Sequence, residues 1–259
     1  MYEKGKTPFK IKVVEPIKWN TREERQKIME EAHFCQAYIP AEKIPINLST
    51  DSGVTAMSQE QWAGMMLGDE SYFGCKNWFN LEKSVQDFTG YRYVLPTHQG
   101  RSAENIVCTT LIKKGDTVLA NAHYGSTEGH ARRLGANPVN LYTEEALRPE
   151  LSVDFKGNID IDKLKKAIKE VGSKNVSFLN MVLENNFTAG QPVSMANLRE
   201  ASKIAHENGI KVVIDSARVP ENAYIIKEKE PGYKDKSIRE ICHEIFSYGD
   251  LMHMSAKKS

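Results

Sequence analysis

Residues 175–215, "NVSFLNMVLENNFTAGQPVSMANLREASKIAHENGIKVVID", carry the pattern that decides the fold. The segments 175–183 and 210–215 are short apolar runs of the kind that form buried strands. Between them, Ser194 precedes the amphipathic segment 195–209 as a helix N-cap. A strand, a helix and a second strand in this order predict a right-handed βαβ unit with two parallel strands.

The same alternation extends in both directions along the chain. Asp160 is the N-cap of one further helix, and Ser237 with Glu240 forms a capping box for another. Strands that alternate with helices of this length predict an α/β fold with a mostly parallel sheet covered on both faces. We expect strands at 93–97, 116–122, 138–142 and 251–254, and helices at 102–112, 127–135, 161–172 and 238–249.

The N-terminal part of the chain shows a different pattern. Thr21 and Glu24 form a capping box, so a helix should begin there. An irregular stretch follows that helix and continues to about residue 55, where neither strand nor helix periodicity is evident.

The composition favours a small ligand over a nucleic acid or a membrane. Lys and Arg number 35 against 34 Asp and Glu, so no strong field marks a polyanionic partner. The sequence holds no run of 18 apolar residues, and its first residues lack the apolar core of a signal peptide. Its four cysteines form no CxxC pair, which argues against disulfides and structural zinc and predicts reduced thiols in a cytoplasmic protein.

Three groups of polar residues follow predicted strands, at the sheet edge where ligands of parallel sheets bind. A glycine and an arginine at the start of a helix suit a phosphate. Each group taken alone has a simpler explanation, namely a tight turn, a helix N-cap or a solvated lysine tail. The groups are Gln99, Gly100 and Arg101; Asp215; and Ser255, Lys257 and Lys258.

Together the three groups match the needs of pyridoxal 5'-phosphate. The helix start would hold the phosphate, and the acid would keep the pyridine nitrogen protonated so that the ring accepts electrons. A strand-end lysine would hold the aldehyde as a Schiff base. The combination is much more specific than any one of its parts.

Seven motifs extend this pattern into a family resemblance. The sequence resembles the β-eliminating lyases of aromatic amino acids, the family of tyrosine phenol-lyase and tryptophanase, from about Phe9 to its last residue. This implies the aspartate aminotransferase-like fold type I of pyridoxal phosphate enzymes. Residues 1–55 would be an N-terminal arm with a substrate-loop segment, and residues 56–259 the N-terminal part of the cofactor-binding large domain. The motifs are "LSTDSG", "AMSQEQWAGMMLGDESYFG", "PTHQGRSAEN", "DFKGNIDIDKL", "GQPVSMANLR", "DSARVPENAYIIKE" and "MSAKK".

The resemblance implies a role for each strand-end residue. Lys258 forms the Schiff base and then takes the Cα proton of the substrate, while Asp215 pairs with the pyridinium nitrogen and Arg218 lies close by. Asn186 lies beside the cofactor's phenolic oxygen and the substrate, and Tyr124 stacks on the ring. The cofactor phosphate is bound by Gln99, Gly100, Arg101, Ser255 and Lys257.

The resemblance also implies roles for residues outside the predicted sheet. Thr50 and Ser52 belong to a loop that reaches the substrate carboxylate. Tyr72 matches the tyrosine that protonates the departing aromatic carbon across a subunit boundary. Glu70 and the backbone of Gly53 match a potassium site between subunits, where oxygen ligands suit a hard cation. These roles imply a homo-oligomer, either a dimer or a tetramer.

The implied activity is β-elimination of a tyrosine-like aromatic amino acid to pyruvate, ammonium and the free aromatic leaving group. Several departures from the family fall near the substrate ring, so a tryptophanase or a lyase for another β-substituted amino acid stays open. An inactive pyridoxal phosphate-binding remnant or partner subunit also stays open. The departures are Ala37, Ser102, Gly125, Phe187 and Thr188.

Two other classes are disfavoured. Tyr72 and Glu70 argue against a transaminase of the same fold, and no GxGxxG follows the first strand as an NAD-binding module would require. Family members continue beyond the Schiff-base lysine through the rest of the large domain and a small domain. We expect activity to need such a second half, supplied in the same chain or by a C-terminal-half partner.

Overall fold

The computed structural model describes residues 17–47 and 57–258. The chain divides into two compact units, Met1–Val54 and Thr55–Ser259. Thr50, Ser52 and Gly53 lie outside the described residues, so their roles stay predictions.

The first unit contains helix α1 (Arg22–Glu31), which begins at the predicted capping box. The Thr21 Oγ1 accepts a hydrogen bond from the Glu24 backbone at 3.1 Å, and the Glu24 carboxylate accepts one from the Thr21 backbone at 2.7 Å. Two 3-10 turns follow, at Gln36–Tyr38 and Ala41–Lys43. The predicted helix start is confirmed, whereas the substrate-loop role of this unit stays a prediction.

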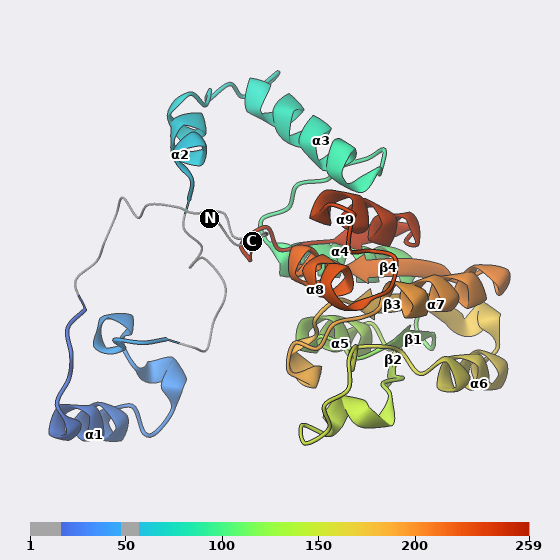
Figure 1. Cartoon of the computed structure of the whole chain (residues 1–259), viewed down its shortest axis with the longest axis horizontal. Coiled ribbons are helices and arrows are strands. Elements are labelled where there is room, and N and C mark those ends of the chain that lie inside the picture. Colours follow the sequence, from blue (N-terminus) through green and yellow to red (C-terminus); the bar gives the residue numbers. More distant parts are fainter. Residues whose placement is uncertain (1–16, 48–56, 259) are drawn as a thin grey trace. The chain divides into compact units, whose positions relative to one another are not determined.

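The second unit is built on a five-stranded sheet in which every strand pairing is parallel. The spatial order is β2-β1-β3-β4-β5, and Figure 1 shows β2, β1, β3 and β4 in this order from bottom to top. The α/β class and the parallel sheet are thereby confirmed. The strands are β1 (Thr117–Ala120), β2 (Asn137–Asn140), β3 (Val176–Val182), β4 (Lys211–Asp215) and β5 (Leu251–His253).

Three helices of this unit begin at the N-caps that the sequence predicts. Asp160, Ser194 and Ser237 each accept the predicted N-cap hydrogen bond. The α-helices are α2 (Gln59–Met66), α3 (Lys76–Thr89), α4 (Gly100–Leu111), α5 (Gly125–Arg133), α6 (Ile161–Val171), α7 (Met195–Glu207), α8 (Val219–Lys229) and α9 (Ile238–Ser247), and short 3-10 turns lie at Glu144–Leu147, Ser173–Asn175 and Asn186–Thr188.

The strands bury side chains on both faces of the sheet. Leu179 and its neighbours on one face pack against α6, α7, α8 and α9. Phe178 and Val213 on the other face pack against residues of α4 and α5. Because both faces are covered, the central strands are apolar runs without polar alternation, as parallel sheets require.

The strand predicted at 93–97 is wrong. These residues lie outside the five-stranded sheet, and Tyr93 and Leu95 are 80% and 71% exposed. Pro96 has no backbone N–H to donate to a ladder, so a short apolar run was not enough to place this segment in the sheet. Among the described residues, no helix is both long and apolar enough to cross a membrane.

Candidate active site

The candidate active site lies at the carboxyl edge of the sheet, where β4 and β5 end. Asp215 is the last residue of β4 and His253 the last residue of β5, and the two are partners in the parallel ladder. Their side chains are buried, with 6% and 4% of each residue exposed. The structure therefore places a buried carboxylate at the strand end where one was predicted.

Asp215 does not cap the next helix. Helix α8 begins at Val219 with Arg218 as its N-cap, so the N-cap explanation of Asp215 is wrong. The Asp215 Oδ1 accepts a long hydrogen bond of 3.4 Å from the Ala217 backbone and lies 3.9 Å from the His253 Nδ1. Burial without a capping role leaves this carboxylate able to accept a hydrogen bond from a ligand.

The start of α4 lies against the residues that follow β5. A Cβ added to Gly100 would lie 3.0 Å from the Ser255 Cβ, so only glycine allows this close approach without a shift. Gln99 is the N-cap of α4 but makes no side-chain capping bond. The first N–H groups of a helix carry partial positive charge and bind anions. The structure thus brings Gln99, Gly100 and Ser255 together, with the exposed Arg101 in the same first turn.

Tyr124 comes to the same edge of the sheet at the start of α5. It is half-buried and is the N-cap of that helix. The turn before it is fixed by His123, whose backbone N–H donates to the Asn140 Oδ1 at 2.7 Å and whose Nδ1 lies 2.8 Å from the same oxygen. Burial lowers the pKa of the His123 imidazole, so the ring is neutral at neutral pH.

The loop after β3 carries Asn186. Asn186 is exposed, whereas the preceding Asn185 is buried and donates from its amide to the Ala122 backbone oxygen. The Arg218 guanidinium donates to the Glu184 backbone oxygen at 2.9 Å and so ties this loop to the start of α8. Burial, followed by the negative charge of Glu221, raises the pKa of the Glu184 carboxyl to about 7, while Arg218 opposes the shift.

The remaining predicted residues lie in less enclosed positions. Ser255 and Lys258 are half-buried after β5, and Lys257 is exposed. Between α2 and α3, Glu70 is exposed and Tyr72 is 91% exposed, with its ring against Phe73 at 4.6 Å between centroids. The exposure of Tyr72 is compatible with a role in another subunit's site, which stays a prediction.

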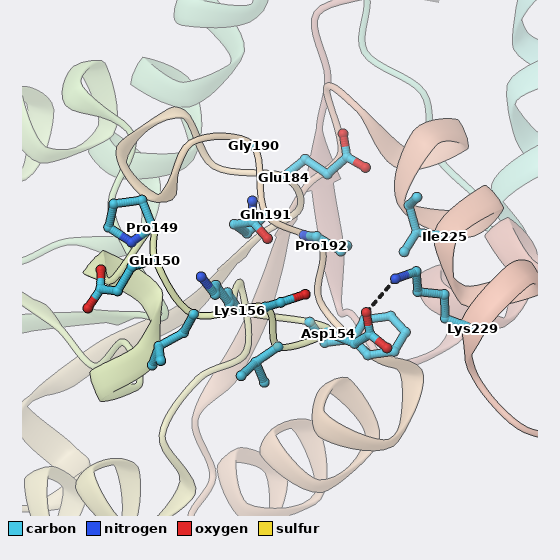
Figure 2. Close-up of a pocket in the computed structure, with 14 residues that line it drawn as sticks. Pro149, Glu150, Asp154, Lys156, Glu184, Gly190, Gln191, Pro192, Ile225 and Lys229 are labelled. Carbon is cyan, nitrogen blue, oxygen red and sulfur yellow. Dashed lines mark hydrogen bonds and ion pairs between the residues drawn. The ribbon is translucent and has the colours of Figure 1, made fainter.

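A hollow of about 520 Å³ lies between residues 149–156, the loop after β3 and helix α8 (Figure 2). Lys229 and Asp154 pair across it at 2.5 Å, and the Lys156 Nζ donates to the Arg148 backbone oxygen at 2.6 Å. None of the predicted site residues lines it. Its lining residues are Pro149, Glu150, Leu151, Ser152, Val153, Asp154, Phe155, Lys156, Glu184, Gly190, Gln191, Pro192, Ile225 and Lys229.

Two buried titratable residues at the carboxyl edge were not predicted. Glu104 and His253 are 6% and 4% exposed, and both lie beside Asp215. His253 could have been found as the polar residue in the apolar run "LMHM". Glu104 could have been found because it follows Gly100 by one helical turn and so shares its face of α4.

The residues at this edge fit pyridoxal phosphate. The start of α4 suits a phosphate. It packs closely against Ser255 because Gly100 has no Cβ. The buried Asp215 carboxylate, one strand end away, suits a protonated ring nitrogen. An all-parallel α/β domain with this arrangement at its carboxyl edge is the large-domain fold of type I pyridoxal phosphate enzymes, as predicted.

The chain belongs to the β-eliminating lyase family, which matches residues 47–259. It is 47% identical to the tyrosine phenol-lyases of Lacrimispora saccharolytica and Clostridium tetani over 97% of its length, covering 54% and 55% of those proteins. It is 46% identical to a probable beta-eliminating lyase of Trichomonas vaginalis over 96% of its length and 54% of that protein. The chain therefore spans about half the length of the curated relatives it matches.

Solved structures show the same fold at much lower sequence identity. A putative aromatic amino acid beta-eliminating lyase/threonine aldolase from Exiguobacterium sp. 255-15 matches with a TM-score of 0.50 and 16% identity, over 78% of this chain and 52% of that one. A chain of the SepCysS-SepCysE N-terminal domain complex matches with a TM-score of 0.50 and 21% identity, over 71% of this chain and 51% of that one. At these identities the likeness supports the fold alone.

Proposed function

We propose that this chain is the cofactor-binding part of a pyridoxal phosphate-dependent carbon-carbon lyase. The reaction is β-elimination of a tyrosine-like aromatic amino acid to pyruvate, ammonium and the free aromatic compound. One observation carries the proposal. The buried Asp215 carboxylate, which caps no helix, lies at the same sheet edge as the start of α4, which packs closely against Ser255. Membership of the β-eliminating lyase family supports the reaction type.

The chain's residues would hold the cofactor at both of its ends. The Asp215 carboxylate would accept a hydrogen bond from the protonated ring nitrogen, and Arg218 would lie close by. Asn186 would lie beside the phenolic oxygen, and Tyr124 would stack on the ring. The bound cofactor supplies an electron sink for the substrate's Cα carbanion. The phosphate would be held by Gln99, Gly100, Arg101, Ser255 and Lys257.

Proton transfer would fall to two residues on different parts of the chain. Lys258 would anchor the cofactor through its amine and, once displaced by the substrate, take the Cα proton. Tyr72, reaching across a subunit boundary, would protonate the ring carbon that leaves. Thr50 and Ser52 would bind the substrate carboxylate, and Glu70 with the Gly53 backbone would bind potassium between subunits.

The leaving group is proposed as a phenol. The tyrosine phenol-lyases among the relatives, at 43% to 47% identity, support this choice. Gly125 follows the stacking tyrosine and Ala37 lies in the first unit, both at positions where the pocket departs from the family pattern. An indole or another β-substituent is the alternative that a substrate series would reveal.

We further propose that the active form is a homo-oligomer in which a second half of the enzyme, in the same chain or in a partner chain, completes the substrate site. The large apolar side chains exposed around α2 and α3 support an oligomer. The cytoplasmic location expected from unpaired cysteines stays a prediction; the four cysteines are free in the structure.

Covalent labelling tests the cofactor assignment. The protein is loaded with pyridoxal phosphate, reduced with borohydride and digested, and the peptides are mapped by mass spectrometry. We expect the label on Lys258 and none on the neighbouring Lys257, which serves as the internal control. A label absent from Lys258, or spread evenly over surface lysines, would show that the carboxyl edge does not hold the cofactor as proposed.

Product analysis tests the reaction. Pyruvate release from L-tyrosine, L-tryptophan and an S-substituted cysteine is measured for this chain alone and for this chain mixed with the C-terminal half of a tyrosine phenol-lyase. We expect pyruvate release from the mixture and not from this chain alone, with L-tyrosine as the best of the three substrates. Full activity from this chain alone would refute the need for a second half, and no pyruvate from any amino acid would favour an inactive binding protein.

A further inference from the structure

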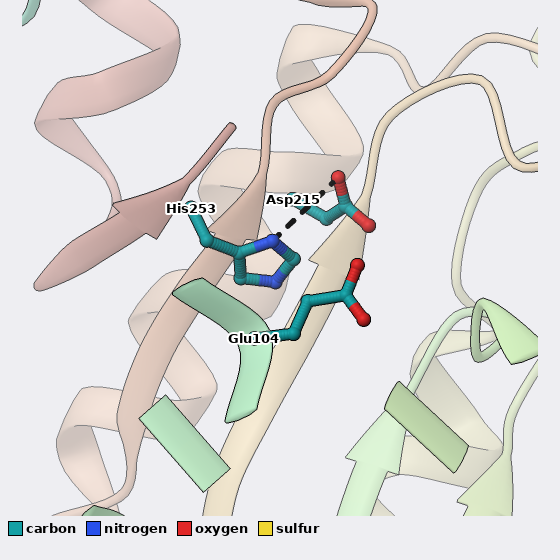
Figure 3. A group of neighbouring side chains, drawn as sticks. All are labelled: Glu104, Asp215 and His253. Atoms are coloured by element: carbon teal, nitrogen blue, oxygen red, sulfur yellow. Dashed lines mark ion pairs between the residues drawn. The ribbon is translucent and has the colours of Figure 1, made fainter. Parts of the chain in front are cut away.

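Three buried titratable side chains meet at the carboxyl edge of the sheet (Figure 3). They are Glu104 from α4, Asp215 from the end of β4 and His253 from the end of β5, and their ligating atoms all lie within 4.8 Å of one another. None is more than 6% exposed. In Figure 3 the two carboxylates lie side by side next to the imidazole ring.

The fold brings these three side chains together in a defined way. Asp215 and His253 are paired residues on adjacent parallel strands, so their side chains leave the same face of the sheet. The Ser216 backbone and hydroxyl each donate to the His253 backbone oxygen at 3.0 Å, which fixes the two strand ends to each other. Asp215 and His253 therefore cannot separate without breaking the end of the ladder.

Glu104 is held against this pair by two helices. It follows Gly100 by one turn of α4, so it lies on the face that approaches Ser255. The Ser126 hydroxyl of α5 donates a hydrogen bond to the Glu104 Oε2. Helix α4 would bind the phosphate at its start. About 6 Å further along its axis, the same helix places the Glu104 carboxylate beside Asp215.

Hydrogen bonding gives the cluster a function. A buried carboxylate is costly unless hydrogen-bond donors lie beside it. A ring nitrogen of His253 lies within 4.8 Å of an oxygen of each carboxylate, and an imidazole N–H can donate to such an oxygen. The Ser126 hydroxyl donates to the other side of the cluster, at Glu104.

We propose that Glu104 is a positioning residue for the cofactor's ring nitrogen: acting through the His253 side chain, it keeps the Asp215 carboxylate turned toward that nitrogen. Without the Glu104 carboxylate, the His253 ring would lose one of its two acidic neighbours and would be free to turn away from Asp215. The inference deepens the proposed function and rests on its assignment of Asp215 to the ring nitrogen.

A set of matched variants tests this inference on the assembled, cofactor-loaded protein. Glu104→Gln removes the charge but keeps an oxygen that can accept from Ser126, whereas Ser126→Ala removes that hydrogen bond and keeps the charge. We expect Glu104→Gln to lower the affinity for pyridoxal phosphate by about tenfold or more, the effect of losing one charge-assisted contact. Ser126→Ala should change it by no more than about threefold. Equal losses in both variants would mean that Glu104 only braces α5, which would overturn the proposal.

Two further readouts separate positioning from structural support. The pH at which the absorption band of the bound cofactor changes should shift in Glu104→Gln and stay in Ser126→Ala. In a double-mutant cycle with His253→Gln, the loss caused by Glu104→Gln should largely vanish, because Glu104 acts through His253. Additive losses, or an unshifted spectrum, would contradict the proposal. If Glu104→Gln does not fold, His253→Gln alone must shift the band, and an unchanged band would have the same meaning.

Failure of this inference is distinct from failure of the proposed function. If the unmodified protein binds pyridoxal phosphate and labels at Lys258, but Glu104→Gln behaves like it, only the role of Glu104 falls. If the unmodified protein does not bind pyridoxal phosphate at all, both the proposed function and the role of Glu104 are wrong.

Discussion

The carboxyl edge of the sheet and the segment around α2 and α3 differ in which side chains they bury. At the edge, the polar residues Glu104, Asp215 and His253 are buried. Around α2 and α3, large apolar residues are exposed, and α2 buries none of its residues. The most exposed are Met66, Leu67, Tyr72, Phe73, Tyr93 and Leu95, at 71% to 91%.

This difference indicates which part of a site one chain can complete. Buried polar groups are costly unless they serve a bound ligand or a hydrogen-bond network, so the edge is organised for chemistry within this chain. Exposed apolar side chains of this size and number mark a surface that another protein segment covers. Cofactor binding should therefore depend on the edge, and full activity on what covers α2 and α3.

Lys258→Ala should have the largest effect and tests the edge directly. Loss of the proposed base should lower turnover by roughly 10²- to 10⁴-fold, the usual worth of a positioned proton-transfer group. Cofactor retention should fall as well, because the covalent anchor is gone. Lys257→Ala is the matched control and should bind the cofactor more weakly while it keeps measurable turnover. Equal turnover in Lys258→Ala and the unmodified protein would remove Lys258 from the mechanism.

Gly100→Ala should have a smaller effect at the same edge. The new Cβ would lie 3.0 Å from the Ser255 Cβ, so the start of α4 must move away from the residues after β5. We expect about tenfold weaker binding of pyridoxal phosphate, corresponding to about 1.4 kcal/mol, in a cofactor titration. Gly129→Ala in α5 is the control: its Cβ meets nothing within 4 Å, so binding should not change. That control should also raise the unfolding free energy by about 0.5–1 kcal/mol.

Leu67→Asp combined with Phe73→Asp tests the other side of the comparison. Both residues are more than 80% exposed, so the fold of the chain should lose little stability, within about 0.5 kcal/mol for each. Association should weaken by about tenfold or more if these side chains lie in an interface, as sedimentation velocity would show. Leu147→Asp, at a 47% exposed site in the second unit, should leave association unchanged. An unchanged oligomer in the double variant would mean that this surface is not the interface.

The sequence allowed most of the carboxyl edge to be predicted, because short-range patterns set where strands and helices end. Parallel strands share one edge, so Gly100, Asp215 and Ser255 could be expected to meet there. The capping box of Ser58 and Gln61 is a further local signal, at the start of α2. By contrast, the apolar run at 93–97 predicted a strand, but these residues lie outside the sheet, and Tyr93 and Leu95 are exposed.

Other features depend on long-range packing and could not be predicted from local patterns. Glu104 meets Asp215 and His253 only because α4 packs against the ends of β4 and β5. Whether Asp215 caps α8 depended on where that helix begins, and α8 starts without a capping side chain. The roles of Tyr72 and Glu70 depend on residues of another subunit, so they remain predictions.

Glu184→Gln should have the smallest effect and measures what burial costs at the edge. Burial raises the pKa of the Glu184 carboxyl to about 7 from an ordinary value of 4.5, so the folded protein holds this proton more tightly than the unfolded chain. Stability should then fall as pH rises from about 4.5 to about 7, because ionisation is opposed by burial and by Glu221. Glutamine keeps the shape and removes this penalty.

At pH 8 Glu184→Gln should therefore be more stable than the unmodified protein by roughly 1–2 kcal/mol, and at pH 4.5 the two should be equal. This is less than the full shift would give, because Glu184 borders the hollow between residues 149–156 and helix α8, and water there screens its charge. Glu150→Gln, on the same hollow, is the control: a hydrogen bond from Arg148 lowers the pKa of its exposed carboxyl, so its removal should not stabilise the protein at pH 8. Parallel thermal unfolding midpoints for Glu184→Gln and the unmodified protein from pH 4.5 to 8 would mean that Glu184 ionises at no cost, and that the edge is less enclosed than its burial indicates.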